Sequence, residues 1–412
     1  MGKPTTRLNV PQVDLRAQYA ALKDEIQEAM VRVCESQRFI LGPEGEALER
    51  ELAEVCGVKH AIGCASGSDA LLLSLVTLGV GPGDEVITVP FTFFATAGAV
   101  ARLGARAAFV DIEPRTFNLD PKKLEAHLNG LDAERRRRTK AILPVHLYGQ
   151  PADMDAINAL AGKFDLPVVE DAAQALGAEV RGGRIGSLGR TACFSFYPTK
   201  NLGAYGDAGM VTTGDAQLAD RLQAMRRHGC THDNYHHDLV GWNSRLDELQ
   251  AAVLRIKLRH LEEWTAARQQ RAARYDELFL GEGLTDHRKT YPDEPHPVVV
   301  PYRADDRRHV FHQYVIRARN PSAPSVSLGT STLRAGRDAL ARFLDEEGIG
   351  TEVYYPVPLH LQGCFHAWGG RGGDFPEAER AAAEVLALPL YPELTQEMQH
   401  SVVSKVADFY RR

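Results

Sequence analysis

Cysteine is scarce in this chain, and its spacing excludes several classes of protein. The 412 residues include six cysteines, at positions 34, 56, 64, 193, 230 and 364. No two of them form a Cys-x-x-Cys pair, and most lie among apolar residues, where cysteine behaves as a small hydrophobe. We therefore expect neither a disulfide scaffold nor a metal site, and the protein should work in a reducing cytoplasm.

Long hydrophobic runs and an excess of positive charge are also missing. The N-terminal segment lacks an apolar core of signal-peptide length, and no uninterrupted apolar stretch could cross a bilayer. The formal net charge of -6 disfavours a general attraction to nucleic acid or to anionic membranes. The one basic run, residues 135–138, is expected on a solvated turn between a helix and a strand. These features predict no nucleic-acid partner and no membrane partner.

The chain does have ample length and apolar material. With 412 residues, 44% hydrophobic and 25% charged, it has a globular composition and enough apolar residues for one large and one smaller domain. From residue 60 onward, short apolar runs alternate with helical patterns. Strands are expected at residues 60–64, 85–89, 107–111, 141–146, 166–169, 192–196 and 210–213, with helices at 69–79 and 92–103. This alternation predicts an α/β fold whose mostly parallel sheet is sandwiched by helices.

Helical and mixed patterns flank this region on both sides. Before it, residues 15–36 and 43–55 have helical spacing and are joined by an apolar, glycine-bearing turn at 38–42. After it come helical stretches at 215–227 and 246–279, a strand at 309–317, a helix at 337–347, a strand at 351–354, and helices at 377–386 and 395–410. We expect N-terminal helices and a large α/β domain over residues 1–245, a connecting helix over 246–280, and a small C-terminal α+β domain over 281–412. A surface loop is expected at 320–335.

An acidic residue and a lysine follow two of the apolar strands. Asp171 ends one run and Lys200 follows another, separated from it by a Tyr-Pro-Thr turn. Burial makes an ammonium lose its proton readily, and the neutral amine is the form that attacks a carbonyl. Pyridoxal phosphate needs such a pair: an amine that forms an imine with its aldehyde, and a carboxylate that keeps its ring nitrogen protonated.

A turn of small residues after the first strand could hold a phosphate. In Cys-Ala-Ser-Gly-Ser-Asp-Ala, residues 64–70, Gly67 and Ser68 open a helix whose exposed N–H groups suit an anion. The alternative is an ordinary helix N-cap, and the sequence leaves both interpretations open. Ser195, five residues before Lys200, can add a hydroxyl to the same phosphate.

Three phenylalanines follow the next strand, in Pro-Phe-Thr-Phe-Phe at residues 90–94. An aromatic ring at the carboxyl edge of the sheet can stack on a flat heteroaromatic ring. We expect Phe93 to take this position, and Phe91 and Phe94 to lie in the core.

Several segments together resemble a known family. The segments SGSDAL, PFTFFAT, VEDAAQALGA, FSFYPTKNLGAYGDAGM, GWNSRLDELQAA and YPVPLHLQ occur in this order. They are similar to those of the DegT/DnrJ/EryC1/StrS family of pyridoxal-phosphate sugar aminotransferases, and the resemblance covers nearly the whole chain. It implies the aspartate-aminotransferase fold, fold type I, and a homodimer with two shared active sites.

The resemblance also implies roles for individual residues. Lys200 resembles the Schiff-base lysine, and Asp171 the partner of the pyridine nitrogen. The remaining cofactor positions implied in this way are Gln174 near the ring hydroxyl, Phe93 as the stacking ring, Gly67, Ser68 and Ser195 at the phosphate, and Asn243 at the phosphate of the neighbouring subunit's cofactor. Substrate-side positions are implied for Phe39, Ile40, Arg245, His312, Tyr355 and His360, each with an alternative as packing or loop structure.

The implied reaction is a ping-pong transamination from L-glutamate to a keto-sugar nucleotide, through pyridoxamine phosphate, in which Lys200 moves the proton. Overall similarity favours a dTDP- or UDP-linked 3-keto hexose, and a 4-keto sugar is the alternative. Relatives with histidine at the lysine position perform dehydration instead, and Lys200 argues against that branch. A non-enzymatic regulatory protein is a more distant alternative. The product would be an amino-sugar nucleotide for polysaccharide or metabolite glycosylation.

Overall fold

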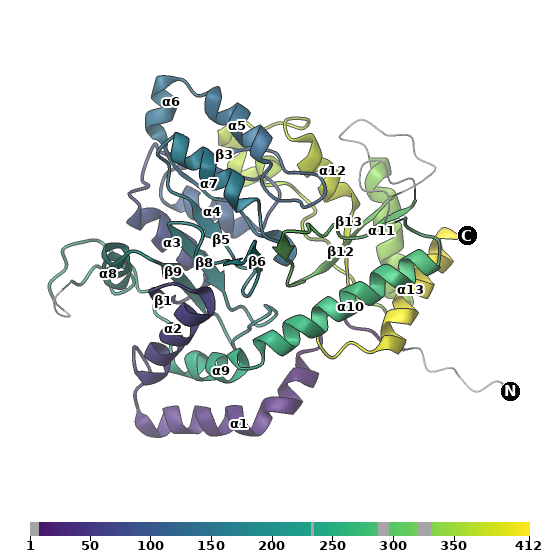
Figure 1. The fold of residues 1–412 in the computed structure, drawn as a ribbon, viewed down its shortest axis with the longest axis horizontal. Helices are drawn as coiled ribbons and strands as arrows, with labels where there is room; N and C mark the ends of the chain where they lie inside the picture. Colours follow the sequence, from purple (N-terminus) through teal and green to yellow (C-terminus); the bar gives the residue numbers. More distant parts are fainter. Residues whose placement is uncertain (1–7, 232–234, 287–295, 320–330) are drawn as a thin grey trace.

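The computed structural model describes residues 8–231, 235–286, 296–319 and 331–412, with only the backbone of 331–335 (Figure 1). One sheet organises the larger part of the molecule. Its strands are β1 (His60–Cys64), β2 (Glu85–Thr88), β3 (Arg106–Phe109), β4 (Thr139–Ile142), β5 (Val169–Asp171), β8 (Thr191–Ser195) and β9 (Gly209–Thr213). They pair in the orders β3-β2-β4 and β5-β8-β9-β1, and parallel bridges from Ile142 to Val168 and from Val145 to Asp171 connect β4 with β5.

Strand direction confirms the prediction of a mostly parallel sheet. Strands β2, β3 and β4 are mutually parallel, and β5 is parallel to β8. Only β9 runs the other way, antiparallel to both β8 and β1. Strands β1 and β8 therefore share one direction, and the ends of β1, β2, β5 and β8 lie at one edge of the sheet.

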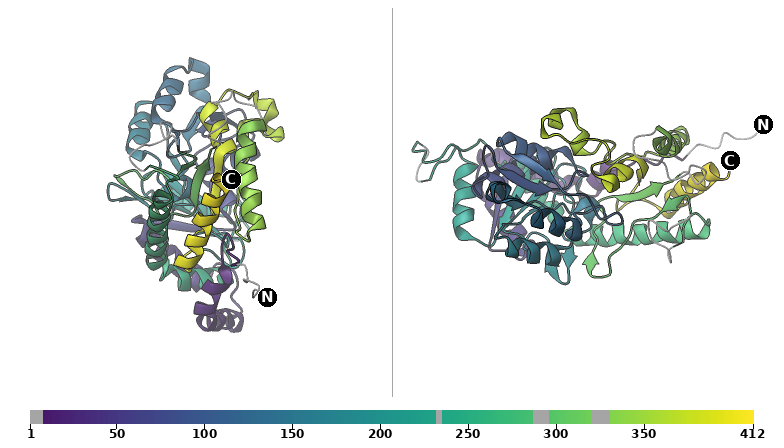
Figure 2. Two further views of the ribbon diagram at one scale, coloured as in Figure 1. Left: turned by 90° about the vertical axis from the view of Figure 1, so that its right-hand side faces the viewer. Right: turned by 90° about the horizontal axis from the view of Figure 1, so that it is seen from above.

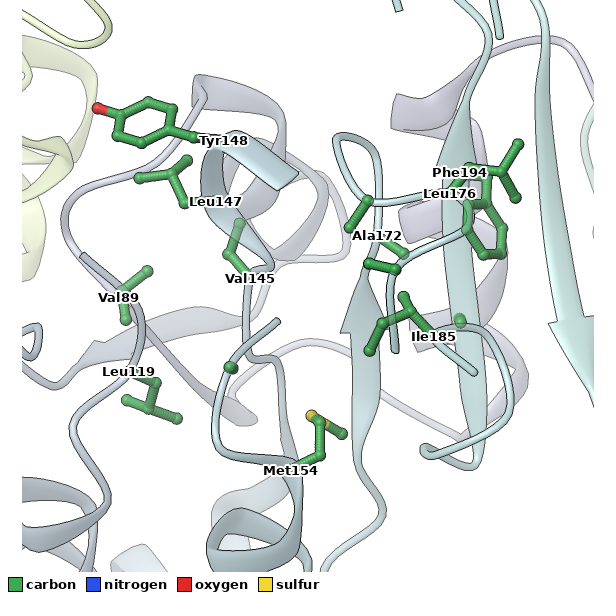
Figure 3. Close-up of a cluster of buried hydrophobic side chains, with 14 of the residues drawn as sticks. Val89, Leu119, Val145, Leu147, Tyr148, Met154, Ala172, Leu176, Ile185 and Phe194 are labelled. Carbon is green, nitrogen blue, oxygen red and sulfur yellow. The ribbon is translucent and has the colours of Figure 1, made fainter. Parts of the chain in front are cut away.

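Helices cover both faces of this sheet. Neighbouring residues of a strand point to opposite faces, and Val86 and Ile87 of β2 accordingly belong to two different buried clusters. One cluster includes α3 (Gly67–Thr77), α4 (Phe94–Arg102) and α8 (Ala216–Met225); the other includes α2 (Pro43–Cys56), α5 (Pro121–Asn129) and α7 (Met154–Lys163). Figure 3 shows side chains of the second cluster, among them Val89, Val145 and Phe194. Burial on both faces explains why these strands read as continuous apolar runs.

The helix predicted over residues 246–279 is two helices. Helix α9 (Glu248–Leu258) ends before Arg259, and α10 (Leu261–Gly281) begins after His260. At the break, the N–H of His260 bonds to the carbonyl of Lys257 at 3.0 Å, and the His260 ring stacks on Trp264 at 5.6 Å. Neither glycine nor proline lies at the break, and the helical spacing of apolar residues continues across it. The sequence pattern therefore predicted a single helix. Helix α10 then leads to the C-terminal elements (Figure 1).

The C-terminal elements form a smaller antiparallel sheet packed with helices (Figure 2). Its strands and helices are β10 (Val298–Val299), β12 (Tyr314–Ala318), β13 (Val385–Leu388), α11 (Ser331–Glu346), α12 (Pro376–Glu384) and α13 (Gln396–Tyr410). The helix predicted at 377–386 is too long, because residues 385–388 pair with β12 instead. The strand predicted at 351–354 is wrong as well, since only a bridge from Glu352 to Ala387 forms there.

Other elements are short or lie at the periphery. They are α1 (Leu15–Ser36), α6 (Ala133–Arg138), β6 (Glu179–Val180), β7 (Gly183–Arg184), β11 (Arg307–Arg308), and the 3-10 turns η1 (Leu147–Gly149), η2 (Leu359–Leu361) and η3 (Gly363–Trp368). The basic run at 135–138 is therefore helical, which corrects the predicted turn; Asp132 caps this helix by accepting from the N–H of Arg135 at 2.8 Å. Of the predicted loop at 320–335, residues 320–330 lie outside the described residues and 331–335 begin α11. Within the described part of the chain, no helix is long and apolar enough to cross a membrane.

A buried ion pair joins the C-terminal sheet to its helix and to the larger part. Arg317 of β12 donates to Glu384 of α12 at 2.9 Å and to the carbonyl of Pro114 at 2.6 Å. Its guanidinium also lies 4.7 Å from the centre of the Phe117 ring. The side chains of Arg317 and Glu384 are only 2% and 6% exposed, so neither charge can turn to solvent if the other is removed.

Glu384→Ala is therefore expected to lower the free energy of unfolding by about 3–5 kcal/mol, because it leaves a buried guanidinium without its carboxylate. Glu377→Ala, on the same helix, removes a less buried pair with Arg380, whose side chains are 20% and 36% exposed, and should cost about 1 kcal/mol or less. Chemical denaturation of the two variants measures the difference. Equal losses would contradict the importance assigned to the buried pair.

Candidate active site

Four chain segments meet at the carboxyl edge of the sheet. They follow β1, β2, β5 and β8, which all run in one direction. Gly209 of β9 pairs with both Cys64 and Ser195, so the ends of β1 and β8 flank a single glycine. Ligands of open α/β sheets bind beyond this edge, and most of the residues singled out from the sequence follow these strands.

The end of β1 and the end of β8 approach each other closely through glycines. A β-carbon on Gly67 would lie 2.5 Å from the β-carbon of Ser195, and one on Gly209 would lie 2.3 Å from the carbonyl of Ser66. Ser66 is the N-cap of α3 and accepts from the N–H of Asp69 at 3.1 Å. The ordinary-cap interpretation is thus correct for Ser66, while Gly67 and Ser68 add the first N–H groups of the helix. These donors and the Ser195 hydroxyl form a site suited to a phosphate.

Asp171 ends β5 with its carboxylate buried. One oxygen, Oδ2, accepts from the Thr96 hydroxyl at 2.8 Å, and Oδ1 accepts from the N–H of Ala173 at 3.3 Å. Burial raises the pKa of Asp171 above its ordinary value, although these two hydrogen bonds and the charge of Lys200 act in the opposite direction. The carboxylate is therefore held by the protein from two sides while it lies in a poorly solvated place.

Lys200 lies in a tight turn after β8. Its N–H bonds to the carbonyl of Tyr197 at 2.8 Å, and a β-carbon on Gly203 would lie 2.2 Å from the carbonyl of Pro198. Burial lowers the pKa of Lys200 to about 8, and the Asp171 carboxylate opposes this shift. The structure thus brings the two residues into electrostatic contact. An amine with this pKa is partly neutral near physiological pH and can act as a nucleophile or a base.

The three phenylalanines of segment 90–94 differ in their burial and in the rings that they contact. Phe93 is the N-cap of α4, is 56% exposed, and has its ring 5.9 Å from that of Tyr355. Phe91 is fully buried, as predicted. The core placement of Phe94 is wrong, since this residue is 48% exposed and stacks on Phe365 at 5.4 Å.

Gln174 connects two tyrosines of the site. Its amide oxygen accepts from the N–H of Tyr148 at 2.6 Å, and its amide nitrogen donates to the hydroxyl of Tyr355 at 3.2 Å. Tyr355 also interacts electrostatically with Asp171, and burial raises its pKa well above the ordinary value. The structure therefore brings Gln174 and Tyr355 together with Asp171 and Phe93.

The segment 243–245 approaches the same site through a residue that the sequence did not single out. The Ser244 hydroxyl donates to Asp69 at 2.7 Å and accepts from the N–H of Ala65 at 3.3 Å. Asn243 is exposed to solvent, and Arg245 is half-buried. Within one chain, Ser244 alone of these three residues bonds to the turn after β1.

Two apolar residues before α2 are exposed on a backbone that is firmly held. Phe39 is 39% and Ile40 is 45% exposed. The carbonyl of Phe39 accepts from the N–H of Glu248 at 2.9 Å, and Ile40 forms a bridge with Asp247. The Glu248 carboxylate accepts from three backbone N–H groups, those of residues 42, 44 and 45, at 2.8–3.0 Å.

The two histidines named from the sequence lie in different places. Nδ1 of His312 and Oδ1 of Asn201, the residue next to Lys200, are 3.1 Å apart. Burial, Lys200 and Arg268 hold the pKa of His312 well below its ordinary value, so the ring is neutral. The structure does not bring His360 to this group, because it pairs with Glu379 at 3.1 Å and packs against Phe375 at 4.7 Å.

Sequence reasoning missed several residues that hold the site in place. Thr96 bonds to Asp171, Ser244 bonds to the turn after β1, and Glu248 holds the turn before α2. Thr96 was detectable in principle, since Thr92 and Thr96 are four residues apart and would share one face of the helix predicted over residues 92–103. Ser244 and Glu248 act on residues more than 170 positions away, and no local pattern marks such contacts. Among the described residues, no group of three or more His, Cys, Asp or Glu could hold a metal ion.

Comparison with known proteins gives a consistent match. A profile of the DegT/DnrJ/EryC1/StrS aminotransferase family matches residues 20–407. The chain is 50% identical over 404 residues to the pleiotropic regulatory protein of Geobacillus stearothermophilus, covering 98% of this chain and 99% of that one. It is 43% identical over 408 residues to UDP-N-acetyl-3-dehydro-alpha-D-glucosamine 3-aminotransferase of Acidithiobacillus ferrooxidans, covering 99% of both. The crystal structure of S. venezuelae DesV in complex with a ketimine intermediate is similar with a TM-score of 0.87 and 42% identity, covering 98% of this chain and 99% of that one.

The pKa of Lys200 gives a first prediction for this site. Acetic anhydride reacts with the neutral amine, so the acetylation rate of Lys200 in the cofactor-free protein should rise with pH and reach half its maximum near pH 8. Asp171→Asn removes the negative charge that favours the ammonium, and should therefore move the midpoint to lower pH. Mass spectrometry of peptides containing Lys200 measures both. A midpoint near 10.5, the ordinary value for lysine, would contradict the described burial.

The close approach of Gly67 to Ser195 gives a second prediction. Gly67→Ala places a methyl group 2.5 Å from the β-carbon of Ser195 and must displace either the start of α3 or the end of β8. We expect the dissociation constant for pyridoxal phosphate to rise by about 10-fold or more. Gly81→Ala is the matched control, because a β-carbon there meets no atom within 4 Å. If Gly67→Ala binds the cofactor as tightly as this control, the phosphate site formed by Gly67, Ser68 and Ser195 has been assigned wrongly.

Proposed function

The chain belongs to the DegT/DnrJ/EryC1/StrS aminotransferase family, and from this membership we propose that it transfers the amino group of L-glutamate to a nucleotide-linked 3-keto hexose. Pyridoxal phosphate is the proposed cofactor. The observation that carries the proposal is the pair of a buried Asp171 carboxylate and a half-buried Lys200, whose amine has a lowered pKa and interacts electrostatically with that carboxylate. This pair meets the two demands that the cofactor makes on a protein.

The residues of the site fit this cofactor. The Gly67 and Ser68 N–H groups and the Ser195 hydroxyl would hold its phosphate in a cradle that a β-carbon on Gly67 would fill. Asp171 would hold the proton on the ring nitrogen, and the exposed ring of Phe93 would stack on the cofactor. Gln174 would donate to, or accept from, the ring hydroxyl through the amide that now joins Tyr148 and Tyr355.

The chemistry divides between the cofactor and the chain. When bound, pyridoxal phosphate supplies an aldehyde that exchanges amines and a ring that withdraws electrons from the neighbouring carbon. Lys200 is the group placed to remove a proton from the carbon that bears the amino group, and to return a proton in the second half of the reaction. Its pKa of about 8 suits both directions, since the ammonium and the free amine are both populated near neutral pH.

The choice of substrate rests on the relatives. The 43% identical protein of Acidithiobacillus ferrooxidans acts, by its name, on a UDP-linked 3-dehydro sugar, which supports a 3-keto hexose linked to UDP or dTDP. A 4-keto sugar nucleotide is the alternative. The 50% identical relative carries a regulatory name, but the Asp171 and Lys200 pair gives this chain the chemical groups of an enzyme.

We also propose that two copies of the chain form a homodimer with shared active sites. Phe39, Ile40 and Val240 are 39%, 45% and 92% exposed, although large apolar side chains are usually buried. Asn243 faces solvent within one chain and would reach the phosphate of the partner's cofactor, with Arg245 near the substrate. His312 and Tyr355, which lie near Lys200 and Asp171, are the proposed substrate-side residues of the same chain.

The proposed domain division follows the fold type I arrangement. Residues 1–245 would form the large cofactor-binding part, 246–280 the connection and 281–412 the small part. In support, α10 leads from the large sheet to the separate sheet of β10, β12 and β13 (Figure 1). A reducing cytoplasm is the proposed place of action, in line with the expectation from the cysteine spacing.

The proposal predicts transfer of labelled nitrogen. The purified protein is incubated with nitrogen-labelled L-glutamate and, in separate reactions, with 3-keto and 4-keto hexoses linked to UDP or dTDP. We expect mass spectrometry to find the label in an amino-sugar nucleotide made from a 3-keto substrate. Lys200→Ala should slow this transfer by at least about 100-fold, because it removes the proton-moving group.

Lys163→Ala on the exposed side of α7 is the control and should keep the wild-type rate; the Lys163 side chain is 64% exposed. Preference for a 4-keto sugar would replace the 3-keto assignment. Failure of the wild-type protein to bind pyridoxal phosphate would rule out the enzymatic proposal altogether and favour a regulatory role.

A further inference from the structure

A short chain of hydroxyl groups connects α4 with the end of β5. The Thr96 hydroxyl lies 2.8 Å from Oδ2 of Asp171, and the Thr92 hydroxyl lies 3.1 Å from that of Thr96. An ionised carboxylate only accepts hydrogen bonds, so Thr96 donates to Asp171 and Thr92 in turn donates to Thr96. The three side chains are 2%, 0% and 5% exposed, in the order Thr92, Thr96 and Asp171.

The hydroxyl group of Thr96 is unusual for its place in α4. The other buried residues of α4 are small or apolar, and valine has almost the same shape as threonine. A buried hydroxyl without a partner would cost free energy, and a helical threonine commonly bonds to a carbonyl of its own preceding turn. Thr96 instead bonds to Asp171 of strand β5, 75 positions away. The placement of Thr96 is therefore explained by its contact with Asp171.

Helix α4 places two groups at the site from its first turn. Phe93, its N-cap, presents an exposed ring, and Thr96, three residues later, reaches the Asp171 carboxylate. The N–H of Leu359 bonds to the carbonyl of Pro90 at 2.7 Å and so fixes the start of this segment. A shift of α4 would move the ring and the hydroxyl together.

The Thr96 hydrogen bond opposes the effect of burial on Asp171. Burial raises the pKa of this carboxyl, and the Thr96 bond is the first of the contributions that lower it. Other titratable groups also act on the carboxylate. Lys200 and His146 favour its charge, whereas Tyr355 and Cys193 have their own pKa values raised by it.

We propose that Thr96 is a positioning residue that holds the Asp171 carboxylate ionised and oriented toward the ring nitrogen of pyridoxal phosphate, with Thr92 as its outer support. This inference rests on the proposed function, because it assumes that the cofactor binds beside Asp171. It adds to that function a residue that makes no contact with the cofactor and acts only through the carboxylate.

Titration of the cofactor-free protein with pyridoxal phosphate tests the inference. The variants are Thr96→Val, which keeps the shape and removes the hydroxyl, Thr96→Ser, which keeps the hydroxyl, and Thr92→Val, which removes only the outer support. Two properties are measured: the dissociation constant of the cofactor, and the pH midpoint of the visible absorption of the complex. A thermal unfolding midpoint is recorded for each protein without cofactor.

We expect Thr96→Val to weaken cofactor binding by about 10-fold or more and to shift the absorption midpoint, because a charged group loses a hydrogen bond. Thr96→Ser should stay within about 2-fold of wild type, and Thr92→Val should have a smaller effect than Thr96→Val. In an Asp171→Asn background, the further change Thr96→Val should alter binding by less than about 2-fold, since the group that Thr96 serves is gone.

The possible failures can be told apart. Wild-type affinity and an unshifted midpoint in Thr96→Val would overturn the role of Thr96 and leave the proposed function intact. An equal loss of affinity with and without Asp171 would also overturn it, since Thr96 would then act only through packing. A wild-type protein that binds no pyridoxal phosphate would instead refute the proposed function.

Discussion

The site depends on placing a partly desolvated amine beside a buried carboxylate at one edge of a sheet. Desolvation alone would drive both groups toward their neutral forms, and it shifts the pKa of Lys200 to about 8 and that of Asp171 upward. Each group also stabilises the charge of the other. Near neutral pH, Lys200 is therefore populated in both protonation states. The charge of the neighbouring Asp171 carboxylate depends on hydrogen bonds and nearby positive charge that oppose the effect of burial. The parallel direction of β5 and β8 makes this possible, because it ends both strands at the same edge.

A lowered pKa by itself does not mark the reactive lysine. Burial lowers the pKa of Lys257 to about 8 as well. Lys257, however, donates to the carbonyl of Gly203 at 2.7 Å and lies 4.4 Å from the centre of the Tyr205 ring. It therefore holds the loop that follows Lys200 from the side of α9. The distinction between the two lysines comes from their partners: a carboxylate at a strand end for Lys200, and a carbonyl and an aromatic face for Lys257.

The sequence was sufficient for those parts of the fold and site that depend on local patterns. Short apolar runs predicted the parallel sheet, and small residues after β1 predicted the turn with Gly67. The sequence was insufficient where a distant contact decides. The helix predicted at 377–386 includes residues 385 and 386, but pairing with β12 makes residues 385–388 a strand. Phe94 reads as core and is instead 48% exposed, while His360 joins a separate group around Glu379. The contact of Thr96 with Asp171 could not be predicted from neighbouring residues, because the two are 75 positions apart. The only local indication is the spacing of Thr96 from Thr92.

Reductive trapping of the bound cofactor distinguishes Lys200 from Lys257 as the lysine that reacts with it. The protein is loaded with pyridoxal phosphate, reduced with borohydride to make any carbon–nitrogen double bond permanent, digested, and examined by mass spectrometry. We expect the pyridoxyl group on Lys200 and no modification of Lys257. The assignment of Lys200 would be contradicted if Lys257 or surface lysines were modified while Lys200 was not, or if no lysine was stably modified.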